Sequence, residues 1–258
     1  MNLRQVVVLI VLFVSALGAQ AQKKKPTKET PETKPEETAA QLPATPEKQT
    51  PEEIDPMLEH YYKKYVMASR WNDNQEAKDA LYDMIIMRPE SDSLVFTLAY
   101  FYFENRQYAP AMLVSQELLA RDSKNLAYLE LSASSFEALG ILDRALQNYE
   151  TLYLISNNTM ALYKIAFLQL DLKRYEEGLT NVDILMSRPE VETVNIGFND
   201  ASNQPKDYLM KFAVLNLKGM LLEGKGDKAA AKAVYQEIIK QQPDFQPAVA
   251  NLAELNKG

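Results

Sequence analysis

Two glutamates on one predicted helix are the residues whose type and spacing best fit catalysis. Glu130 and Glu137 lie seven residues apart, which in a helix separates them by two turns, about 10 Å along the axis. Two carboxylates at that separation resemble the acid and base of a glycoside hydrolase. Carboxylates on a helix face are usually just solvated, so we predict no catalytic residue here.

Other chemistry-bearing residue types are scarce. The chain has no cysteine and a single histidine, His60, which excludes disulfides and thiolate chemistry and predicts no metal site. A net charge of −7 without a basic stripe argues against a nucleic-acid partner. Asn157-Asn158-Thr159 fits a glycosylation triplet, but its place between predicted helices explains it as a turn. We therefore predict no cofactor.

The first residues predict an export signal. A short polar start with Arg4 precedes an apolar run from Val6 to Leu17, and Ala19-Gln20-Ala21 offers the small residues that a signal peptidase reads. The run is shorter than the roughly 20 residues of a membrane-spanning helix. We predict a signal peptide at residues 1–21, cleaved after Ala21, and a periplasmic mature protein; an uncleaved anchor is the alternative.

Residues 22–55 form a separate segment rich in Lys, Pro, Glu and Thr. Leu42 and Ile54 are its only large apolar residues, so burial cannot offset the entropy lost on ordering. We predict a disordered linker here and one helical domain over residues 56–258.

From Pro56 onward, apolar residues recur at intervals of three and four, which predicts helices joined by short turns. Small residues repeat just after these turns at Ala77, Ala111, Ala145, Gly178 and Ala231. A second column precedes the turns at Tyr65, Ala99, Ala133, Ala166 and Gly219. Both columns have spacings of 34, 34, 33 and 53, so one unit recurs with a single insertion. Small side chains at such positions let paired helices approach closely.

This pattern resembles the tetratricopeptide repeat family. In the last unit, Gly219, Gly226-Asp227, Ala231, Tyr235 and Pro243 stand where the family has its glycine, turn, alanine, aromatic residue and terminal proline. The family's usual tryptophan in the first helix is absent from every unit. The resemblance implies an all-α fold, a right-handed superhelical solenoid of about five antiparallel helix pairs. We expect the pairs at 57–90, 92–124, 126–157, 159–189 and 207–243, and a C-terminal capping helix at 247–256.

The insertion covers about residues 191–206. Thr193 to Phe198 alternates polar residues with apolar or small ones, and residues 199–203 are typical of a turn. A β-hairpin and an irregular loop fit equally well.

The resemblance also implies that the first helix of each pair lines a concave groove, which predicts a partner-binding surface. The predicted groove residues are Tyr62, Val66, Phe96, Tyr100, Phe103, Glu130, Ser134, Glu137, Tyr163, Phe167, Asn216 and Met220. An alignment shift of one residue would exchange these positions for core positions. The family's chaperone-binding clamp uses Lys, Asn and Arg where this chain has Tyr62, Phe96, Glu130 and Tyr163, so that use is not predicted.

These observations predict a non-catalytic scaffold or adaptor in the bacterial cell envelope that binds a protein or peptide segment in its groove. An accessory subunit that docks on an envelope enzyme or transport complex through its edges or its insertion is the alternative. A glycan-processing enzyme using Glu130 and Glu137 is a third hypothesis. We predict no membrane span in the mature chain, and we do not predict a homo-oligomer.

Overall fold

The computed structural model describes residues 55–257. The predicted signal peptide and residues 22–54 of the predicted linker lie outside this range. The described part is all-α apart from one hairpin, which confirms the predicted fold class. Its α-helices are α1 (Pro56–Arg70), α2 (Asn74–Met87), α3 (Asp92–Glu104), α4 (Tyr108–Arg121), α5 (Leu126–Ala138), α6 (Leu142–Ser156), α7 (Thr159–Asp171), α8 (Tyr175–Met186), α9 (Met210–Lys225), α10 (Lys228–Gln241) and α11 (Gln246–Leu255).

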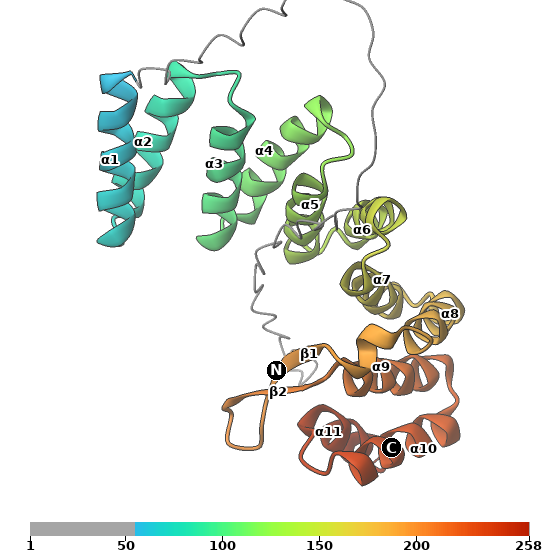
Figure 1. Ribbon diagram of the computed structural model, residues 1–258. Helices are drawn as coiled ribbons and strands as arrows, with labels where there is room; N and C mark the ends of the chain where they lie inside the picture. The colour runs from blue at the N-terminus through green and yellow to red at the C-terminus, as the bar shows by residue number, and fades with distance from the viewer. Residues whose placement is uncertain (1–54, 258) are drawn as a thin grey trace, which may run out of the picture.

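The helices form consecutive pairs that stack into a curved solenoid (Figure 1). Each odd-numbered helix from α1 to α9 packs against the next helix, and each even-numbered helix packs against the first helix of the following pair. Figure 1 shows α5, α7 and α9 nearer the inner side of the arc than α6, α8 and α10; α1 and α3 are the corresponding first helices of the two preceding pairs. No helix between residues 55 and 257 has both the length and the apolar character that crossing a lipid bilayer requires.

The turn inside each pair has the same structure in every repeat. The first helix ends in a left-handed residue, with φ between 58° and 99° at Asn72, Arg106, Gly140, Lys173 and Gly226. The amide after this residue donates to the carbonyl five residues earlier, for example from Gln107 to Tyr102 at 2.8 Å. This bond satisfies a carbonyl at the helix end that would otherwise lack a partner.

The small residues identified in the sequence lie where helices touch. Ala77, Ala111, Ala145 and Ala231 have no exposed surface. A Cβ atom at Gly219 would overlap the ring of Tyr235, which α10 contributes. The packing of α9 on α10 therefore depends on the missing side chain.

The insertion is a β-hairpin, and not an irregular loop. A short 3-10 helix, η1 (Pro189–Glu192), leads into strands β1 (Asn195–Asn199) and β2 (Pro205–Leu209), which pair antiparallel. The expected fifth pair at 207–243 begins later than predicted, because β2 continues to Leu209 before α9 starts. The hairpin is anchored to the last repeat, since the rings of Phe198 and Tyr208 each lie 5.1 Å from that of Phe245.

Candidate functional site: the concave face

The inner side of the arc is formed by α1, α3, α5 and α7, and we call this surface the concave face. Its first part is apolar and accessible. Tyr62 and Val66 on α1 are 58% and 45% exposed, and Tyr100 on α3 is 39% exposed. Phe96 is half-buried, with its ring 6.5 Å from that of Tyr100 and 5.3 Å from that of Tyr128. This part of the face therefore presents aromatic and aliphatic side chains to solvent.

Phe103, also predicted on the groove, serves mainly in packing. Its ring lies 5.4 Å from that of Tyr108, and it contacts the cores of the first two helix-pair junctions. Partial burial, together with the neighbouring Glu104, raises the pKa of Tyr100.

The centre of the concave face is a polar network between α5 and α7. Lys164 on α7 donates to both carboxylate oxygens of Glu137, at 3.0 and 3.2 Å. Tyr149, which reaches through from α6, donates to Glu137 at 3.2 Å and lies 3.0 Å from the hydroxyl of Ser134. Two predicted groove residues, Ser134 and Glu137, are thus held in place by side chains of neighbouring helices.

Two further carboxylates flank this network without a partner. Among the described residues, neither Glu130 on α5 nor Asp171 on α7 makes a side-chain hydrogen bond or an ion pair. Loss of hydration raises the pKa of both carboxyl groups; Lys164 opposes this effect at Glu130, and Glu137 adds to it at Asp171. Both residues remain exposed to solvent, so their loss of hydration is partial. A cation placed here would offset that cost.

Two predicted groove residues are not on the surface. Tyr163 on α7 is 4% exposed, because it belongs to a buried cluster that includes Val191 and Ile196 of the insertion and Met210 of α9. The prediction that Tyr163 lines the groove is therefore wrong.

The prediction that Asn216 on α9 lines the groove is also wrong. It is 8% exposed, and its carboxamide oxygen accepts a 3.0 Å hydrogen bond from Asn251 of the capping helix α11. Phe167 and Met220 are half-buried and pack on the cores beneath them. The accessible concave face therefore extends from α1 to α7 and does not reach α9.

Three residues of this site were not predicted from the sequence: Lys164, Tyr149 and Asp171. Lys164 adjoins a predicted groove position, but no periodic signal distinguished it from a solvated lysine. The described residues contain no group of three or more His, Cys, Asp or Glu side chains arranged to hold a metal ion. Glu137, one of the two glutamates considered for catalysis, already pairs with Lys164.

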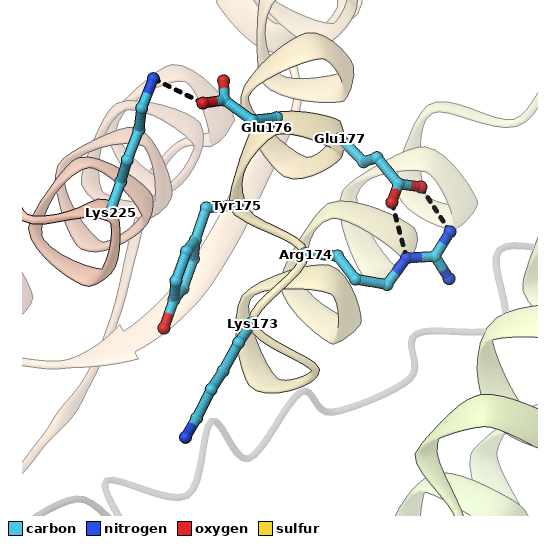
Figure 2. A pocket seen from close by; sticks show the side chains of 6 residues that line it. All are labelled: Lys173, Arg174, Tyr175, Glu176, Glu177 and Lys225. Carbon is cyan, nitrogen blue, oxygen red and sulfur yellow. Dashed lines mark hydrogen bonds and ion pairs between the residues drawn. The ribbon is translucent and has the colours of Figure 1, made fainter.

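A depression lies where the turn before α8 meets the end of α9 (Figure 2). It is lined by Lys173, Arg174, Tyr175, Glu176, Glu177 and Lys225. Its charges are largely paired internally: Lys225 lies 2.6 Å from Glu176, and Arg174 donates to Glu177 at 2.8 Å. We interpret this depression as a junction between repeats, since Tyr175 packs against Gly224 there.

Comparisons with known proteins agree with the observed architecture. Residues 208–244, which contain α9 and α10, match the model of the tetratricopeptide repeat. No curated protein matches the sequence. Among solved structures, a tetratricopeptide repeat protein from Parabacteroides merdae ATCC 43184 is 18% identical, with a TM-score of 0.64 over 77% of this chain and 72% of that one.

Two other solved structures share this architecture. Residues from 41 to the end of MamA from Desulfovibrio magneticus RS-1 are 12% identical, with a TM-score of 0.57 over 72% of this chain and 96% of that one. YrrB, described as a TPR protein with an unusual peptide-binding site, is 13% identical, with a TM-score of 0.58 over 74% of this chain and 89% of that one. At these identities the similarity shows the fold.

The stacked helix pairs define a helical-repeat solenoid. Residues 208–244 match the tetratricopeptide repeat model, and the described helices have the fold of solved tetratricopeptide repeat proteins.

Proposed function

We propose that this chain is a non-catalytic scaffold or adaptor that binds a segment of a partner protein along its concave face. One observation carries the proposal: exposed aromatic and aliphatic side chains on α1 and α3 lie on the same face as the unpaired carboxylates of Glu130 and Asp171. Proteins of this family are generally scaffolds, and YrrB, which has the same fold, is described as having a peptide-binding site.

The face favours a partner segment that combines apolar and basic side chains. Burying the exposed parts of Tyr62, Val66 and Tyr100 would contribute about 25 cal/mol for each Å² removed from water. Lys164 already neutralises Glu137, which leaves Glu130 and Asp171 as an excess of negative charge. A lysine or arginine of the partner would compensate that charge and the lost hydration.

A charge reversal tests this proposal. Glu130→Lys would repel a basic segment, whereas Glu150→Lys makes the same change on the outer helix α6. We expect partner capture from bacterial envelope extracts to be lost with Glu130→Lys and retained with Glu150→Lys. Equal capture by both variants would contradict binding at the concave face. If the purified chain hydrolyses a glycan and Glu130→Gln abolishes that hydrolysis, the result would instead favour an enzyme.

We further propose that the chain works in the bacterial cell envelope after export. The sequence of residues 1–21 supports this, because its apolar run and its Ala19-Gln20-Ala21 site fit a signal peptide. The test is the intact mass of the full chain expressed in a bacterium and recovered from the periplasmic fraction. A mass beginning at Gln22 is expected, and a cytoplasmic protein that retains Met1 would contradict export.

A further inference from the structure

The register of the hairpin determines which backbone groups of each strand bond to the other strand and which point away from it. Met210 donates to the Val194 carbonyl at 2.8 Å, and Asp200 donates to the Gln204 carbonyl at 2.8 Å. These two pairs share the register of the strands, in which Ile196 lies opposite Tyr208. Because hydrogen-bonded pairs alternate along an antiparallel ladder, Ile196 and Phe198 bond to β2. The amides and carbonyls of Asn195, Gly197 and Asn199 therefore point away from it.

The two edges of the hairpin differ in their ability to accept another strand. On β1, Asn195, Gly197 and Asn199 are exposed, and each supplies both an amide and a carbonyl. On β2, the first outward position is Pro205, which has no amide proton to donate. The neighbouring Lys206 pairs with Asp244 of the segment after α10. Natural sheets block edges in this way, so β1 is the edge with the more complete set of free donors and acceptors.

The hairpin lies within the curve of the solenoid. Ile196 belongs to the same buried cluster as Tyr163 and Ala166 of α7, and Figure 1 shows the hairpin on the inner side of the arc, before α9. Among the helices, β1 packs on α9, which itself packs on α7. The aromatic contacts to Phe245 hold the hairpin in place, so the edge is formed before any partner arrives.

We propose that β1 accepts the partner segment as an extended third strand of this small sheet. This inference rests on the proposed function, and it adds the conformation of the partner and the way it is recognised. The segment would bond to the outward backbone groups of Asn195, Gly197 and Asn199, which bind main chain without regard to side-chain identity. It must therefore be extended and free of proline at the residues that face β1.

Matched proline substitutions test this inference. Gly197 and Asp207 lie directly opposite each other in the register, and both amides point outward. Gly197→Pro removes a donor from the β1 edge, and Asp207→Pro makes the equivalent change on the β2 edge, each without removing a bond between the strands. The probes are peptides selected on the wild-type chain from a random-peptide display library. We expect Gly197→Pro to weaken them about tenfold, as the loss of a hydrogen bond predicts, and Asp207→Pro to leave them unchanged.

Hydrogen exchange of the wild-type chain gives a second readout that needs no substitution. A bound peptide should slow the exchange of the Gly197 and Asn199 amides and leave that of Asp207 unchanged. Peptides that lose affinity with Glu130→Lys but bind Gly197→Pro normally, without this protection, would overturn strand addition and leave the concave-face proposal standing. Peptides that bind both variants as tightly as wild type, or failure to select any peptide, would count against strand addition and against the concave-face proposal. If the wild-type chain self-associates and Gly197→Pro abolishes this, the strand added to β1 comes from a second copy of the chain, and the proposed partner segment is wrong.

Discussion

The packing of α9 on α10 predicts a large effect from the smallest substitution, Gly219→Ala. A Cβ atom at this position would lie too close to three atoms of the Tyr235 ring, and Tyr235 has no exposed surface into which it could move. Overpacking of this kind costs up to about 3 kcal/mol. Alanine recovers about 1 kcal/mol of helix propensity relative to glycine. The net loss in the free energy of unfolding is therefore up to about 2 kcal/mol.

Thermal unfolding followed by circular dichroism measures this loss. For a domain of this size, 2 kcal/mol lowers Tm by about 4–8 °C. Gly178→Ala is the matched control, since its Cβ would meet a methyl group of Leu221 at 2.6 Å, and a methyl group moves more readily than a ring. We expect a loss of about 1 kcal/mol or less there. In a Tyr235→Leu background, Gly219→Ala should become stabilising; a Gly219→Ala melt at or above that of wild type would refute the reasoning.

Two further predictions concern the hairpin and the carboxylates. Phe245→Ala removes the ring that Phe198 and Tyr208 contact, so the free energy of unfolding should fall by about 3–5 kcal/mol. The hairpin amides should also lose their protection from hydrogen exchange. Persistent protection would show that another contact anchors the hairpin. The pKa of Glu130 is raised above its ordinary value of 4.5, so the charged carboxylate disfavours the folded state at neutral pH. Glu130→Gln should therefore be more stable than wild type at pH 7, and the difference should vanish below about pH 4.5. A difference independent of pH would contradict the raised pKa. Asp171→Asn should likewise be more stable than wild type at pH 7 but not in acid.

The sequence predicts the solenoid well because a periodic pattern has a local physical cause. The buried alanines at Ala77, Ala111 and Ala145 are required wherever one helix meets the next, so their spacing reports the repeat directly. The left-handed residues after each first helix follow the same period, but at Arg106 and Lys173 they carry side chains that rarely adopt this conformation. In those two turns the packing of the helices determines the left-handed backbone conformation. The residue types at these positions do not predict it.

The candidate site is less predictable, because segments distant in sequence decide which positions stay exposed. Tyr163 occupies a groove position by alignment, yet it is buried in a cluster with residues of the insertion and of α9. Asn216 is covered by the helix that ends the stack. Neither contact leaves a periodic signal. The pairing of Lys164 with Glu137 likewise joins two repeats and follows from neither one alone.

Site-specific photo-cross-linking in intact bacterial cells tests the central claim most directly. A photoreactive residue at Tyr100 lies on the concave face, and one at Leu113, which is 64% exposed on α4, lies on the outer helix of the same pair. The account predicts that Tyr100 cross-links to one dominant protein in the envelope and that Leu113 does not. Equal cross-linking at both positions, or a dominant product at Leu113 alone, would contradict partner binding on the concave face.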